Sequence, residues 1–286
     1  MGSGIKMKSV LLFGAGYSAS AWAASLPGDV IVHRTRRRMV DSATIVFDGT
    51  APIADFATRF KDVDTILHSI PPDAATGVDP VWHWHAEDIK ALPHLRWFGY
   101  LSTTAVYGDW QGDWVDETSE LRGALPRARA RIEAERRWLE SSLPAHVFRL
   151  AGIYGAGRNA LKDMREGTAR RVVKPGQVFS RIHVEDIAAL LNASTVRPRP
   201  GAVYNGADDL PCAGHEVVTY AAELLGLTPP PYVDFAAATL SPMAQSFYAD
   251  CKRVRNALMK QELGVQLRYP DYKAGLMALA AAGEGR

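Results

Sequence analysis

The first residues with a chemical implication are the small ones that follow a short apolar run. Val10–Phe13 predicts a buried strand, and Gly14, Gly16 and Ala19 follow it with G-x-G-x-x-A spacing. In such a loop the first glycine permits a tight turn, the second lets a pyrophosphate approach the backbone, and the alanine allows close helix–strand packing. The helix that starts here would turn its free N–H groups and positive end toward the phosphates. The pattern predicts a dinucleotide-binding loop, with an ordinary structural turn as the alternative.

The residues after the second expected strand, 30–32, indicate which dinucleotide is bound. A ribose 2′-hydroxyl is usually held by an acidic residue at this point, and a 2′-phosphate by arginine. The chain has no Asp or Glu there and continues with His33, Arg34, Thr35, Arg36 and two further arginines. We expect Arg34 and Arg36 to bind a 2′-phosphate, with Thr35 as a hydroxyl donor. NADP is therefore predicted in preference to NAD, although part of the arginine run would also suit a basic surface turn.

Alternating strand and helix patterns must position these residues. Apolar strand patterns fall at 10–13, 30–32, 44–47, 65–70, 97–101 and 147–150, and helical patterns at 18–25, 53–60, 80–92 and 127–141. Strands separated by helices pair in parallel through right-handed crossovers. The expected fold class is α/β, a Rossmann-type doubly wound parallel sheet with ligands beyond the strand C-termini.

The second half of the chain is less regular. Helical patterns cover 184–191, 216–225 and 271–282, and a short strand pattern covers 202–205. We expect an NAD(P)-binding Rossmann domain over residues 7–178, with helix 184–191 packing back on it. Residues 192–286 would form a smaller lobe that covers the cofactor and binds the substrate. Residues 1–6 look like a cloning remnant ahead of a natural start at Met7.

Composition restricts the partners. The chain has 286 residues, 47% hydrophobic and 22% charged, and its net charge of +2 does not favour nucleic acid. No apolar run reaches the ~20 residues needed to span a membrane. The two cysteines, Cys212 and Cys251, form no zinc or redox motif, so a cytoplasmic setting is expected. His83 and His85 would lie about 200° apart on a helix, so no shared metal ion is expected and both are assigned to packing.

Four blocks occur in a recognisable order. They are Gly14–Ala19, Leu101–Asp109, Arg149–Gly157 and Arg181–Ala188. Together they resemble the extended short-chain dehydrogenase/reductase superfamily, in its epimerase/dehydratase-like branch, over roughly residues 8 to 190. The resemblance implies a Rossmann core, a nicotinamide cofactor and a C-terminal substrate lobe.

One departure from the family pattern bears on catalysis. The family's catalytic pair is Tyr-x-x-x-Lys on the helix after the second block, and here Arg127 and Arg131 fall at those two positions. Arginine stays protonated and is a poor general acid or base, although it can bind a ribose hydroxyl or a phosphate. The chain is therefore similar to atypical members that lack the pair.

The resemblance also suggests individual site residues. Thr103 stands at the family's Ser/Thr position and would hydrogen-bond a substrate oxygen, or would simply cap the backbone. Tyr107 is the nearest replacement phenol, and His183 would face the substrate or lie in the core; these three are the catalytic candidates. The residues expected to bind the cofactor are Gly14, Gly16, Tyr17, Ser18, Ala19, Arg34, Thr35, Arg36, Asp48, Ser69, Pro71, Arg131 and Tyr154.

The leading hypothesis is an NADP-dependent oxidoreductase that transfers hydride to or from a small carbonyl, alcohol or sugar-like substrate. The alternatives are a sugar-derivative epimerase or dehydratase with tightly bound NAD(P), and a non-catalytic NADP-binding redox sensor. The expected partner is a small-molecule substrate, without nucleic acid or membrane. A homodimer through the helices around 80–92 and 127–141 is a further possibility implied by the family.

Overall fold

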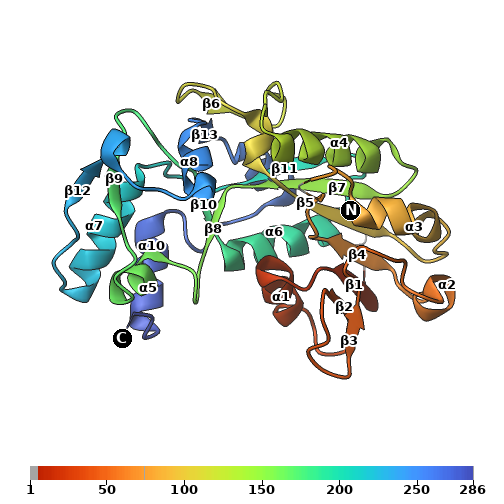
Figure 1. The fold of residues 1–286 in the computed structure, drawn as a ribbon. Helices are drawn as coiled ribbons and strands as arrows, with labels where there is room; N and C mark the ends of the chain where they lie inside the picture. Colours follow the sequence, from red (N-terminus) through yellow and green to blue (C-terminus); the bar gives the residue numbers. More distant parts are fainter. Residues whose placement is uncertain (1–5, 74, 286) are drawn as a thin grey trace.

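The computed structural model describes residues 6–73 and 75–285, so the proposed cloning remnant lies outside the described residues except for Lys6. A seven-stranded parallel sheet forms the centre, in the order β11-β7-β5-β4-β1-β2-β3 (Figure 1). Its strands are β1 (Ser9–Phe13), β2 (Ile31–Arg36), β3 (Thr44–Val46), β4 (Thr65–His68), β5 (Trp97–Thr103), β7 (Ala145–Leu150) and β11 (Val203–Gly206). The predicted Rossmann-type α/β fold is confirmed. The strand order reverses between β1 and β4, where such sheets open a ligand crevice.

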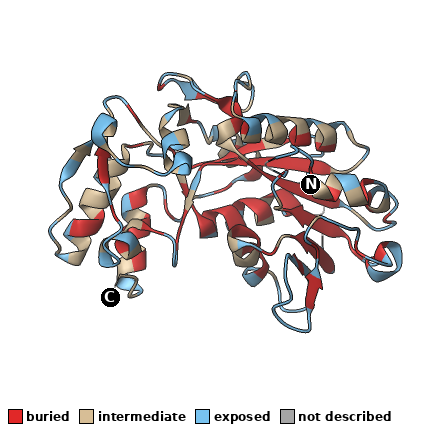
Figure 2. Ribbon diagram, in the orientation of Figure 1, coloured by how far each residue is buried: buried red, intermediate tan, exposed pale blue. Residues whose placement is uncertain are grey.

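Two helical layers cover the sheet, and alternation along β1 explains why both faces are apolar. Leu12 belongs to the core under α1 (Tyr17–Ala24) and α6 (Val184–Val196). Its neighbour Leu11 belongs to the core under α2 (Phe56–Arg59), α3 (Pro80–Lys90) and α4 (Pro126–Glu140). Figure 2 shows the central strands buried, with exposed residues on the outer sides of the helices.

A second lobe has a core of its own. It contains α5 (Ala160–Arg165), α7 (Gly214–Leu225) and α10 (Tyr272–Ala281), with β9 (Arg171–Val173) paired to β12 (Tyr232–Asp234). The remaining elements are η1 (Thr104–Tyr107), β6 (Trp114–Val115), β8 (Gly152–Tyr154), β10 (Arg181–His183), η2 (Phe235–Ala237), α8 (Pro242–Tyr248), β13 (Arg253–Val254) and α9 (Ala257–Leu263).

The two lobes are not consecutive stretches of chain. β11 pairs with β7 in the main sheet, and α9 packs on β11 and α6. Residues 203–206 and 257–263 therefore belong with the nucleotide-binding core, so the boundary predicted at residue 192 is wrong for these segments. The physical reason is that β7 needs a partner strand on its open edge, and β11 supplies it with a fully buried Tyr204. Among the described helices, none is both long and apolar enough to cross a membrane.

Candidate functional site

The turn after β1 has the geometry that its glycines predict. Gly14 has φ +83°, and a Cβ there would lie 2.8 Å from Ile70 Cγ1 and 2.9 Å from Ser69 Oγ. Its N–H donates to Thr35 Oγ1 over 2.8 Å, and Ser69 Oγ lies 3.1 Å from the Phe13 carbonyl oxygen. The ends of β1, β2 and β4 thus hold this turn together, and a side chain at residue 14 would be excluded by both conformation and space.

Helix α1 presents an open N-terminus next to this turn. Gly16 is its N-cap, no side chain caps the helix, and its first turn contains no acidic residue. A Cβ at Gly16 would meet nothing nearer than the Gly14 carbonyl oxygen at 4.0 Å, so the space in front of the backbone is free. Ser18 and Ala19 are buried against the core and can contribute only through their backbone. This is the cradle that a pyrophosphate requires.

A groove of about 630 Å³ runs from this turn toward the end of β3. Six of the predicted cofactor residues line it: Gly14, Gly16, Arg36, Asp48, Ser69 and Pro71. Asp48 Oδ1 accepts hydrogen bonds from the backbone N–H of Thr50, over 2.9 Å, and from its hydroxyl, over 2.7 Å. These bonds lower the pKa of Asp48, so the carboxylate is an ionised acceptor at one end of the groove.

The arginine run is arranged differently from the prediction. β2 extends to Arg36, four residues beyond its predicted end, so Arg34 lies inside the paired strand and its guanidinium returns to the Val32 carbonyl oxygen over 3.3 Å. Thr35 is fully buried, with its hydroxyl holding Gly14. The predicted contact of Thr35 with a 2′-phosphate is therefore wrong. Arg34 is exposed and does not line the groove, and its contact stays a prediction. Arg36 and Arg37 line the groove. The arginine run in the sequence indicated this region, but Arg37 was not among the predicted residues.

The loop after β8 closes against the glycine turn from the second lobe. Tyr17 donates its hydroxyl hydrogen to the Ala156 carbonyl oxygen over 2.9 Å. A Cβ on Gly155 would come within 2.7 Å of the Tyr17 hydroxyl. Tyr154 is buried in the second lobe and donates to the Asp271 carbonyl oxygen over 3.2 Å. The side chain of Tyr154 therefore does not face the groove, and only the backbone of this loop is available to a cofactor.

His183 is a buried, neutral imidazole. Its Nδ1 accepts the Glu185 N–H over 3.3 Å, which leaves the proton on Nε2, and Nε2 has no hydrogen-bond partner among the described residues. Burial lowers its pKa to about 4. His183 is only 2% exposed, so of the two positions considered above it occupies the core. Nε2 lies 3.4 Å from the position a Cβ on Gly155 would take, so it is an unused donor behind the loop that meets Tyr17.

Tyr107 is also buried inside the protein. The turn of η1 buries it completely, its hydroxyl donates to Asn205 Oδ1 over 2.7 Å, and it accepts from Arg149 Nη1 over 3.1 Å. Burial raises its pKa to about 12. The prediction that Tyr107 supplies the substrate's proton is therefore wrong.

The partners of Tyr107 form a buried ionic network that the sequence analysis missed. Arg149 Nη2 and Glu135 Oε2 are 2.8 Å apart, both side chains are almost fully buried, and Ser102 donates to Glu135. Glu135 lies one helical turn after Arg131 on α4, and Arg149 is the next-to-last residue of β7 and the first of the third family-like block. The network links the carboxyl ends of β5 and β7 to α4. Spacing alone did not distinguish it from the solvated charges of α4.

Thr103 keeps a hydroxyl that can act on a ligand. It is half-buried at the end of β5, and its Oγ1 accepts the Ala105 N–H over 3.2 Å, which confirms the capping role considered above. Because the oxygen is the acceptor in that bond, the hydroxyl hydrogen is still free to donate to a substrate oxygen.

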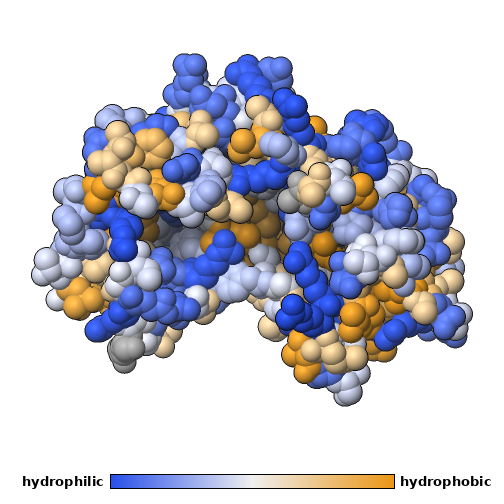
Figure 3. Space-filling view, viewed as in Figure 1, coloured by the Kyte–Doolittle hydropathy of each residue, from blue (hydrophilic) through white to orange (hydrophobic). Residues whose placement is uncertain are grey.

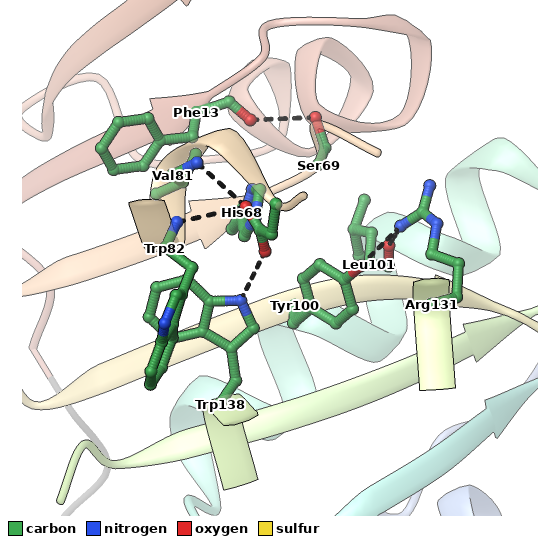
Figure 4. Close-up of polar contacts among 10 residues, drawn as sticks. Phe13, His68, Ser69, Val81, Trp82, Tyr100, Leu101, Arg131 and Trp138 are labelled. Atoms are coloured by element: carbon green, nitrogen blue, oxygen red, sulfur yellow. Dashed lines mark hydrogen bonds and ion pairs between the residues drawn. The ribbon is translucent and has the colours of Figure 1, made fainter. Parts of the chain in front are cut away.

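The two arginines at the Tyr and Lys positions bind different parts of the molecule. Arg131 Nη1 donates to the Leu101 carbonyl oxygen over 2.6 Å and to the Tyr100 hydroxyl over 3.1 Å, as Figure 4 shows. Arg127 Nη2 donates to Ser246 Oγ on α8 over 2.7 Å. Arg131 therefore holds the end of β5, and Arg127 links α4 to α8.

A second buried cluster supports the groove from below. His68 Nε2 lies 2.9 Å from Asp79 Oδ2, and Trp138 Nε1 donates to the same oxygen over 2.8 Å (Figure 4). Asp79 also accepts the Val81 N–H at the start of α3. The cluster ties α3 and α4 to the end of β4, directly before Ser69. Within residues 6–73 and 75–285, no group of three or more His, Cys, Asp or Glu residues could hold a metal.

Comparison with known proteins places this geometry in a family. No family profile and no curated protein matches the chain. A solved structure of a functionally unknown conserved protein from Silicibacter pomeroyi DSS is 47% identical, with 97% of this chain and 100% of that chain covered and a TM-score of 0.87. The chain belongs to the same family as that protein.

More distant structures share its fold. Human epimerase family protein SDR39U1, solved with NADPH, is 18% identical over 96% of this chain and 99% of its own, with a TM-score of 0.74. The dTDP-glucose 4,6-dehydratase of Bacillus anthracis, solved with NAD, is 20% identical over 95% and 94%, with a TM-score of 0.71. The chain therefore shares the fold of these NADPH- and NAD-bound structures. A space-filling view shows a hollow between the two lobes (Figure 3).

Proposed function

We propose that the chain binds NADP and catalyses hydride transfer to or from a small carbonyl or alcohol substrate. The observation that carries the proposal is the groove that joins the uncapped N-terminus of α1 to Arg36 and Arg37. In the described part of the chain neither arginine has a carboxylate within 4 Å, so both guanidinium groups are available to a 2′-phosphate. Solved structures with NADPH and NAD on the same fold support a nicotinamide dinucleotide.

The residues present fit such a cofactor. The turn at Gly14 and Gly16 would hold the pyrophosphate, and Ser69 and Pro71 would line its course toward the riboses. Arg131 would offer its remaining N–H groups to the nicotinamide ribose from the end of β5. The bound nicotinamide supplies or accepts a hydride.

Of the three catalytic candidates, only Thr103 is partly exposed and has a hydroxyl hydrogen that is free to donate. It would donate its hydroxyl hydrogen to the reacting oxygen of the substrate and so orient that oxygen. Tyr107 is locked in the buried network, and His183 is neutral and enclosed. We propose that the proton that accompanies the hydride is exchanged with water.

Substitution of Thr103 tests the proposal. Thr103→Val removes the donor and keeps the shape, and we expect turnover in a carbonyl substrate screen to fall at least 10²-fold while NADPH binding stays unchanged. Thr104→Val is the matched control one residue away. Equal turnover in Thr103→Val and Thr104→Val would contradict the role given to Thr103.

A redox sensor is the second candidate. It is favoured by one observation, the replacement of the family's acid/base pair by Arg127 and Arg131, both engaged in contacts within the protein. A sensor would turn over no substrate and would bind NADP⁺ and NADPH with very different affinities. Similar affinities for the two forms, together with turnover, would contradict it.

A further inference from the structure

Arg127 is a cation that has only neutral partners. Its Nη2 donates to Ser246 Oγ over 2.7 Å, its Nη1 lies 2.9 Å from the Met243 sulfur, and its guanidinium lies 5.3 Å from the Phe247 ring centre. Among the ion pairs of the described residues none involves Arg127. A thioether is a weak acceptor, so much of the hydrogen-bonding capacity of this half-buried guanidinium is unused.

The position of Arg127 makes this arrangement costly without an anion. It is the second residue of α4, whose first turn has no capping side chain and no acidic residue. The positive end of a helix dipole disfavours a cation, and partial burial adds to the cost. A negative group bound by Arg127 would offset both terms.

A second cation approaches the same helix from the other lobe. Lys174, after β9, donates to the carbonyl oxygen of Tyr248 at the end of α8 and lies 5.4 Å from the Phe235 ring. It also has no carboxylate partner in residues 6–73 and 75–285. Both cations therefore contact α8, Arg127 at Ser246 and Lys174 at the carbonyl oxygen of Tyr248. None of the seven residues of α8 is buried, and the helix lies beside the hollow between the lobes (Figures 1 and 3).

We propose that Arg127 binds an oxyanion of the substrate, so that the substrate is a carbonyl or alcohol carrying a carboxylate or a phosphate. The inference rests on the proposed function for the reacting group, but the anion site can be tested without turnover. The oxyanion takes the place of the Ser246 hydroxyl and the Met243 sulfur on the guanidinium. Arg131, one turn further along the same face of α4, stays on the end of β5, so the anion would lie about one helical turn from the residue proposed to hold the nicotinamide ribose.

The test is a calorimetric titration of the full chain, at low salt, with inorganic phosphate and, separately, with malonate. We expect the wild type to bind at least one of them and Arg127→Gln to bind it at least tenfold more weakly. Arg129→Gln is the matched control, because Arg129 is exposed on α4 and takes part in no side-chain hydrogen bond or ion pair of the described residues. Preference for phosphate or malonate decides between a phosphorylated and a carboxylated substrate.

Two further measurements distinguish anion binding at Arg127 from anion binding in the cofactor groove. Phosphate also suits Arg36 and Arg37, so the titration is repeated on the Arg36→Gln/Arg37→Gln double variant. Binding that survives there and is lost in Arg127→Gln belongs to the inferred site. Equal binding by wild type and Arg127→Gln, or no binding of either anion by wild type, would overturn the inference. If the wild type does not bind NADPH, the proposed function is overturned. The titrations with phosphate and malonate would still test the anion site on their own.

Discussion

Asp208 provides a test of the buried electrostatics. It follows β11, is 1% exposed, and has one carboxyl oxygen without a partner among the described residues; the other lies 3.4 Å from the Leu210 N–H. Burial raises its pKa from 3.8 to about 7. Asp208→Asn keeps the shape and removes the titration.

The size of the effect follows from the pKa shift. Because the folded state holds the proton more tightly, Asp208 contributes stability that is fully present below pH ~4 and is lost as the pH rises through about 7. Three pKa units correspond to about 4 kcal/mol in total, of which about 3 kcal/mol falls between pH 5 and pH 8. Over that interval the free energy of unfolding of the wild type should fall by this amount relative to Asp208→Asn.

The assay is urea unfolding at several pH values, followed by tryptophan fluorescence and circular dichroism. Asp209→Asn is the matched control, since Asp209 is adjacent but partly exposed and paired with Lys260. Its difference from wild type should vary little with pH. Parallel pH profiles for Asp208→Asn and wild type would refute the reasoning.

Three further substitutions test the site's supports. Thr35→Val leaves the Gly14 N–H without its acceptor and should cost about 1–3 kcal/mol of unfolding free energy, with weaker NADPH binding; an unchanged unfolding midpoint would contradict the assigned contact. Arg149→Met leaves Glu135 charged and buried and should cost about 3–5 kcal/mol by denaturant titration, and a cost under 1 kcal/mol would show that the pair is not buried as described. Tyr107→Phe should lower stability by about 1–3 kcal/mol yet leave the pH dependence of turnover unchanged, whereas a lost pH limb would restore Tyr107 as the acid.

The parallel sheet and the glycine turn could be predicted because both depend on local sequence. Alternation and apolar runs identify strands, Gly14 has a positive φ that disfavours other residues, and Gly16 leaves the space in front of the helix open. Asp48, Ser69 and Pro71 line the groove because each closely follows the carboxyl end of a strand.

The failures share a physical cause. The outcome for Tyr107, His183 and Thr35 depends on burial, which tertiary packing decides and a motif does not encode. The lobe boundary was predicted wrongly because β11 joins the main sheet from a stretch of chain without strong periodicity. The ion pair between Glu135 and Arg149 was not predicted, because tertiary packing brings these two residues together.

The proposal that the chain is an NADP-binding protein is tested most directly by fluorescence titration with NADPH and with NADH, using energy transfer from its seven tryptophans. NADPH should bind at least tenfold more tightly than NADH, and Arg36→Gln/Arg37→Gln should abolish the difference while NADH affinity stays the same. Failure of folded protein to bind either dinucleotide, or equal affinities for the two, would contradict the account.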